Sequence, residues 1–139
     1  MKSVFILLLM VVITSQAWGQ ERKRARAYGV RIGVLPTGTN NAITDVKGVK
    51  VGHTTLLQGN HIRTGVTAIL PHEGNLFQEK VPATVYVGNG FGKMAGSTQV
   101  QELGNLETPI VLTNTLSIGT SMNAVIDYTL QQAGNEDVQ

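Results

Sequence analysis

The stretch VKVGHTTLLQGNHIRTGVTAIL, Val49–Leu70, decides the fold class of this chain. It holds two runs rich in β-branched residues, separated by Gln58-Gly59-Asn60, and Pro71 stops the second run. Two such runs around a short connection that contains Gly and Asn are typical of a β-hairpin. We therefore predict antiparallel strands over residues 49–57 and 62–70.

Downstream of this hairpin, strand and helix signals alternate. We predict a strand over residues 81–87, a glycine-rich turn over 88–93, a helix over 94–103, a strand over 108–113 and a helix over 118–133. Gly104 and Gly134 supply the helix stops. The uninterrupted apolar run of the second of these strands predicts burial on both of its faces.

The last helix has one apolar face, formed by Ile118, Met122, Val125, Ile126, Thr129, Leu130 and Ala133. About four strands with two helices on one side of the sheet place the chain in the α/β class. Such a sheet has one face without cover, so the sequence looks like part of a larger layered domain.

We interpret the first nineteen residues as a targeting segment rather than as part of the folded domain. Lys2 precedes ten uninterrupted apolar residues, 4–13, and Ala17-Trp18-Gly19 offers a small-residue cleavage site. This three-part pattern is typical of a secretory signal peptide, and an apolar run of ten residues is too short to span a bilayer. We expect cleavage after Gly19 and a secreted or periplasmic product.

Charge and composition narrow the classes of partner. The chain has 139 residues, 42% of them hydrophobic, and no Cys, which indicates one ordinary globular domain or a piece of one. Five of its eleven basic residues lie in an arm over residues 20–33, whereas the body from Ile32 onward carries five basic and eight acidic residues. No aromatic residue is interleaved in the charged run of this arm over residues 21–26, so we expect a solvated segment, no nucleic-acid partner, and no membrane contact beyond the signal peptide.

Candidate catalytic groups are few in residues 20–139. His53, His61 and His72 match no metal-ligand spacing, so we expect no metal, and no serine lies in a G-x-S-x-G elbow. Ser117 is interpreted as the cap of the second helix rather than as a nucleophile.

The glycine-rich turn fails as a phosphate site. Val87 stands where a P-loop requires Gly, and Asn114 or Thr115 stands where a dinucleotide fold places an acidic residue. Gly88, Gly90 and Gly92 still allow backbone N–H groups to approach a ligand carbonyl or carboxylate at the start of a helix. No cofactor is expected.

Four motifs in order carry a family resemblance: NAITDVKGVKVGHTT (41–55), IRTGVT (62–67), NGFG (89–92) and TNTLSIG (113–119). With them the chain resembles the DmpA/BapA family, the L-aminopeptidase/D-esterases and β-peptidyl aminopeptidases, from about Gly29 to its end. The resemblance assigns residues 34–139 to the N-terminal part of the family's α-chain domain. It implies a partial αββα four-layer sandwich, here one sheet with helices on one face.

The resemblance also implies an N-terminal-nucleophile mechanism. A precursor cuts itself before a Ser or Thr, and the freed residue attacks the first carbonyl of a short peptide, amide or ester that has a free amine. In relatives this nucleophile and its partners lie beyond the position of Gln139, so no catalytic residue is assigned and this chain alone is expected to be inactive. The missing β chain, the rest of the α chain and a homo-oligomer of αβ pairs are the expected partners.

Five residues in the third and fourth motifs are candidate substrate-binding residues: Asn89, Gly90, Gly92, Asn114 and Ser117. Two alternatives remain open for the function. The chain could be a non-catalytic remnant or binding module, or it could belong to a related self-cleaving acyltransferase.

Overall fold

The computed structural model describes residues 22–138, so the predicted signal peptide over residues 1–19 lies outside the described residues. The chain divides after Pro36 into two units. In the described part of the first unit, a short 3-10 helix, η1 (Ala25–Tyr28), ends at Gly29, whose φ of 83° is a left-handed conformation that suits glycine. None of the residues of η1 is buried.

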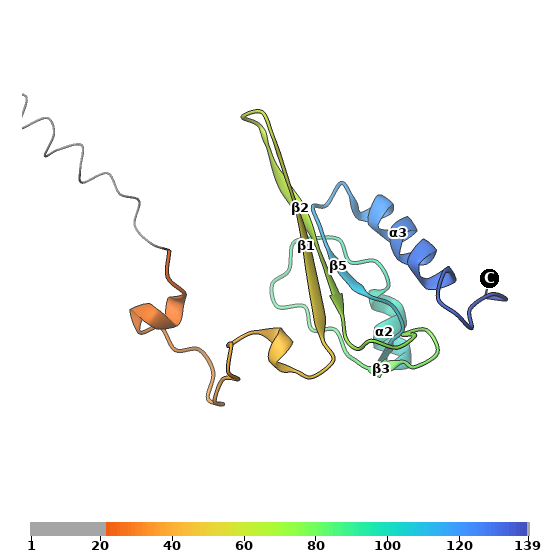
Figure 1. The fold of residues 1–139 in the computed structure, drawn as a ribbon, viewed down its shortest axis with the longest axis horizontal. Coiled ribbons are helices and arrows are strands. Elements are labelled where there is room, and N and C mark those ends of the chain that lie inside the picture. Colours follow the sequence, from red (N-terminus) through yellow and green to blue (C-terminus); the bar gives the residue numbers. More distant parts are fainter. Residues whose placement is uncertain (1–21, 139) are drawn as a thin grey trace, which may run out of the picture. The chain divides into compact units, whose positions relative to one another are not determined.

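The second unit is built on the predicted hairpin, which the structure confirms. Strands β1 (Lys50–Gln58) and β2 (Ile62–Leu70) pair antiparallel, with Lys50 opposite Leu70 and Gln58 opposite Ile62 (Figure 1). Gly65 permits a close approach of the two strands, since a Cβ there would lie 2.5 Å from the carbonyl oxygen of Thr54. Packing of the two strands therefore requires glycine at position 65.

The third strand of this sheet is β5 (Ile110–Leu112), which pairs antiparallel with β2 and gives the order β1-β2-β5. The predicted position of this strand is confirmed, but its predicted burial on both faces is wrong. Ile110 and Leu112 are 37% and 56% exposed, and only Val111 between them is half-buried. The apolar run belongs to a short strand at a sheet edge rather than to a strand inside a parallel sheet.

The predicted strand over residues 81–87 is wrong beyond its second residue. Strand β3 (Val81–Pro82) pairs with a two-residue strand that the sequence did not predict, β4 (Asn105–Leu106), in a separate ladder. A bond from the backbone N–H of Ala83 to the carbonyl oxygen of Gly104 (2.9 Å) extends this ladder. β-Branched composition alone does not make a strand where no partner backbone is available, which is the case from residue 84 onward.

Both predicted helices form, with shifted ends. Helix α2 (Ser97–Leu103) begins three residues after the predicted start and ends at Gly104, whose φ of 67° confirms the predicted stop. Helix α3 (Ile118–Leu130) ends before the predicted residue 133. Figure 1 shows α3 alongside the three-stranded sheet, and α2 beside the β3–β4 ladder, which it contacts through β4.

The predicted core face of α3 is only partly covered. Ile118, Val125 and Thr129 are half-buried, whereas Met122, Ile126 and Leu130 are 46%, 51% and 44% exposed. In residues 22–138, the buried residues are Leu76 and Asn135. A core this small and an apolar stripe this exposed fit the prediction that the chain is part of a larger layered fold.

Asn135 is buried and lies at the centre of a cluster of side-chain amides. Its side-chain oxygen accepts hydrogen bonds from Asn75 Nδ2 and Gln78 Nε2, both at 2.9 Å, and its amide nitrogen donates to the carbonyl oxygen of Thr129 at 2.7 Å. We call Asn75, Gln78 and Asn135 the amide clasp. The clasp joins the loop after β2 to the turn after α3, two segments about sixty residues apart in the sequence.

Candidate active site

The candidate residues Asn89, Gly90 and Gly92 lie in a long loop between β3 and α2, all three exposed (Figure 1). Every residue from 86 to 96 is exposed, and no hydrogen bond is formed by residues 84–93 with any part of the described chain. Asn89 has a φ of 53°, a left-handed conformation that Asn tolerates better than most residues. The peptide groups of this turn are therefore without hydrogen bonds in the described chain.

The predicted position of this turn at the start of a helix is wrong. Helix α2 begins at Ser97, five residues after Gly92, and its N-cap is Gly96 with a φ of 79°. The turn therefore gains no help from the N-terminus of α2 in binding an anion. What it can offer a substrate is peptide N–H groups and exposed side chains, among them that of Phe91.

Asn114 and Ser117 lie together at the start of α3. The side-chain oxygen of Asn114 accepts the backbone N–H groups of Leu116 and Ser117, both at 3.1 Å. Ser117 is the N-cap by position, but its side chain makes no capping bond, so the interpretation of Ser117 as the capping side chain is wrong. The Asx-type turn of Asn114 bonds the backbone N–H groups of the two residues just before α3 and leaves those of the first turn of α3 unbonded by a side chain in the described chain.

Asn114 also ties the end of β5 to the hairpin, because its Nδ2 donates to Thr64 Oγ1 at 3.3 Å. No hydrogen bond within residues 22–138 joins this segment to the turn around Asn89. The five candidate residues thus form two separate groups in the described chain.

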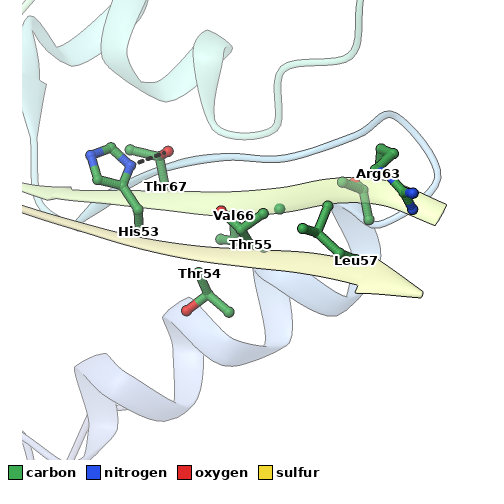
Figure 2. Close-up of a pocket in the computed structure, with 9 residues that line it drawn as sticks. His53, Thr54, Thr55, Leu57, Arg63, Val66 and Thr67 are labelled. Carbon is green, nitrogen blue, oxygen red and sulfur yellow. Dashed lines mark hydrogen bonds between the residues drawn. The ribbon is translucent and has the colours of Figure 1, made fainter. Parts of the chain in front are cut away.

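Sequence reasoning missed an open groove of 390 Å³ on the hairpin, shown in Figure 2. Its lining includes His53 and Thr67, which are opposite each other in the register and are joined through His53 Nδ1 and Thr67 Oγ1 at 2.9 Å. Arg63, at the far end, donates from Nη1 to the carbonyl oxygens of Gly59 and Ile62. Both polar side chains are bonded to residues of the hairpin itself.

The acidic groups with lowered pKa values also have structural roles. Backbone N–H groups of Asn40 and Ala42 hold the pKa of the Asp45 carboxyl below its usual value, with Asn40 N at 3.0 Å and Ala42 N at 3.1 Å. A Cβ at Gly38 would lie 2.4 Å from Asp45 Oδ2. The NAITD part of the first motif is therefore a turn built around one carboxylate.

No catalytic set is assembled in the described part of the chain. The Ser97 hydroxyl donates to the Met94 carbonyl oxygen at 3.2 Å, and no serine hydroxyl in residues 22–138 is bonded to a His, Asp or Glu side chain. Across the same residues, no three His, Cys, Asp or Glu side chains form a group that could hold a metal ion. None of the helices described is long and apolar enough to cross a bilayer.

Comparison with known proteins identifies the family of this chain. The sequence model of Peptidase family S58 matches residues 41–139. The chain belongs to Peptidase family S58. This confirms the resemblance drawn from the four motifs, since the match spans all of them.

Curated S58 relatives are much longer than this chain. Two proteins named β-peptidyl aminopeptidase BapA are each 36% identical to it, one from Sphingosinicella microcystinivorans and one from Sphingosinicella xenopeptidilytica. The first alignment covers 89% of this chain and the second 94%, and each covers 33% of the relative. The chain thus spans about a third of the length of the curated relatives it matches.

Solved structures confirm the fold class. The PH0078 protein from Pyrococcus horikoshii OT3 is 53% identical with a TM-score of 0.75, over 84% of this chain and 35% of that protein. The β-aminopeptidase from Burkholderia sp. is 43% identical with a TM-score of 0.72, over 81% of this chain and 33% of its own. The antiparallel sheet and two helices of this S58 chain are accordingly a partial α/β fold.

Proposed function

We propose that this S58 chain is the N-terminal part of an aminopeptidase that releases N-terminal residues from short peptides, amides or esters, β-amino-acid types included. Its membership of a peptidase family and its two relatives named β-peptidyl aminopeptidase support this proposal. The peptidase match also favours this reading over a self-cleaving acyltransferase.

The nucleophile of the proposed reaction comes from outside residues 22–138. One observation carries this step, namely that no serine hydroxyl in these residues is bonded to a group that could take its proton. We propose a Ser or Thr freed by self-cleavage in a segment that follows Gln139 in the precursor. Its hydroxyl would attack the substrate carbonyl while its own amine takes the proton, and water would then release the acyl group.

In the proposed enzyme this chain binds part of the substrate and holds the segments that form the pocket. The turn around Asn89 offers unpaired peptide N–H groups, and Asn114 fixes the segment between β5 and α3 through three hydrogen bonds. We assign Asn89, Gly90, Gly92, Asn114 and Ser117 to walls of the substrate pocket. The two groups meet across the substrate only when the rest of the enzyme is present.

Complementation tests this proposal. The chain from residue 20 to 139 is mixed with the remaining two thirds of an S58 relative, and release of aniline from an aminoacyl anilide is followed. We expect no turnover by the chain alone and turnover by the mixture, abolished when the first residue of the relative's freed segment is changed to Ala. Turnover by the chain alone, lost on changing one of its own serines, would overturn the proposal.

A non-catalytic binding module is the second candidate, favoured by the lack of a catalytic set in the described residues. It predicts that the mixture stays inactive while the chain still binds a short peptide with a free amine. Isothermal titration with such a peptide separates the two candidates, because an active mixture is incompatible with a remnant.

We also propose that the protein is exported and that residues 1–19 are removed. Expression of the whole reading frame with mass spectrometry of the mature protein tests this. A new N-terminus at Gln20 supports export, and intracellular protein that retains Met1 contradicts it.

A further inference from the structure

We propose that Asn89 is a site of spontaneous deamidation, where the side-chain amide is lost and aspartate and isoaspartate are formed. Of the nine asparagines in the chain, Asn89 alone is followed by glycine. The reaction begins when the backbone nitrogen of the next residue attacks the side-chain carbonyl carbon. A following glycine favours it, because no Cβ hinders that nitrogen.

Hydrogen bonds of the side-chain amide and of the neighbouring peptide groups protect most asparagines in folded proteins, and Asn89 has neither in the described chain. The side-chain amide of Asn89 is exposed and makes no hydrogen bond with any described residue, so no bond must break before attack. The peptide groups of residues 84–93 are likewise without hydrogen bonds in the described chain. Rotation of the backbone at Asn89 into the geometry of attack therefore costs no hydrogen bond.

The step balances with water as the only co-reactant. The nitrogen of Gly90 forms a bond to Cγ of Asn89 and loses its proton, while the amide nitrogen leaves as ammonia. Water then opens the five-membered imide at either carbonyl. One opening gives aspartate, and the other gives isoaspartate, in which the backbone runs through the side-chain carbon.

Other asparagines of the chain lack this combination. Asn75 and Asn135 are held by the amide clasp, and Asn114 by its turn. Asn60, at the hairpin tip, is exposed and without a described hydrogen bond, but His61 follows it. Asn60 is thus an internal control for the effect of the following residue.

The reaction would place a carboxylate in a turn that is neutral apart from Lys93. The isoaspartate form would also lengthen the backbone next to Phe91 and displace that side chain. Deamidation itself does not depend on the proposed peptidase function. Any effect on substrate binding does, so the test below uses a chemical readout.

Peptide mass mapping of the purified chain, incubated at mildly alkaline pH, tests the proposal. We expect Asn89 to be the first asparagine to convert, at least several-fold faster than Asn60, with both acid isomers separated by chromatography. Gly90→Ala should slow conversion several-fold, and Asn89→Gln should remove it. The added methyl group at residue 90 would lie 3.0 Å from Val87 Cγ1, a contact that a side chain can relieve.

The same incubation in urea tests the contribution of the fold. Similar rates at Asn89 in the native and the unfolded chain support an unprotected turn. Native conversion many-fold slower than unfolded conversion would overturn the proposal, as would an unchanged rate in Gly90→Ala. Asn75 and Asn135 should show strong protection in the native chain and none in urea.

Discussion

Two regions of this chain contain the same Gly-Asn pair, but the asparagine is hydrogen-bonded in one region and exposed without a hydrogen bond to described residues in the other. In the amide clasp, Asn75 follows Gly74 and Asn135 follows Gly134, and Asn135 is only 1% exposed with both of its amide atoms bonded. In the loop after β3, Asn89 follows Gly88 and makes no hydrogen bond with the described residues. The dipeptide alone does not determine whether its asparagine is bonded. The segments that the fold places beside it determine this.

The difference separates scaffold from candidate site. The clasp connects two loops and surrounds one of the few buried residues described, so its loss should affect the whole second unit. Within residues 22–138, the turn around Asn89 forms no hydrogen bond that stabilises that unit. Its exposed groups are available to a ligand or to another part of a longer protein. Four experiments test this difference and the stability of the second unit around it.

The largest effect is expected at the centre of the clasp. Asn135→Ala empties a buried site, leaves the amides of Asn75 and Gln78 without their shared acceptor and removes the donor to the carbonyl oxygen of Thr129, which should cost about 3 kcal/mol in the free energy of unfolding. Urea unfolding followed by circular dichroism measures it. The matched control, Asn89→Ala, should change stability by less than about 0.5 kcal/mol, and equal effects at the two positions would refute the contrast.

A pair of glycines gives the next largest effect. Gly65→Ala places a Cβ 2.5 Å from the backbone oxygen of Thr54, so the paired strands must separate, and we expect a loss of about 2 kcal/mol. Gly92→Ala meets no atom within 4 Å and should leave stability unchanged or raise it by about 0.5 kcal/mol. Thermal unfolding of the two variants checks this, and a destabilised Gly92→Ala would show that the turn is packed.

A smaller effect is expected at the ion pair that ties the loop after β2 to the residue after β4. Lys80 bonds to Glu107 and lies over the ring of Phe77, 4.5 Å from its centroid. Burial raises the pKa of Glu107, but bonds from Lys80 and Gln99 outweigh it and keep the pKa low. Because the Lys80 side chain is 39% exposed, solvent screens the pair, and Glu107→Gln should cost about 1 kcal/mol in chemical unfolding.

The smallest effect is a pH dependence at Asp45, in the turn before β1. Its folded-state pKa is lowered, so its contribution to stability is complete above about pH 4 and is lost as the pH falls through the lowered value. Asp45→Asn should flatten the acid limb of the stability curve relative to the parent chain. An unchanged acid limb would show that the backbone N–H groups of Asn40 and Ala42 do not favour the charged carboxyl.

Much of this fold could be predicted from local sequence. The hairpin, both helices and the stop at Gly104 follow from β-branched runs, helical spacing and glycine, which act within a few residues. The strand predicted over residues 81–87 failed beyond Pro82 because β4, its partner among residues 22–138, is two residues long. The predicted capping bond from the Ser117 side chain is absent, and Asn114 forms a turn that bonds the backbone N–H groups of Leu116 and Ser117, just before the helix.

The family and the order of elements can be read from the amino-acid sequence alone, since motifs and short-range patterns involve residues that are neighbours along the chain. Tertiary structure decided which asparagine is buried in the clasp, which glycine is needed between strands, and that Asn89 and Asn114 lie in groups with no hydrogen bond between them in the described chain. These outcomes depend on atoms from segments up to sixty residues apart, and no local pattern encodes which segments will meet.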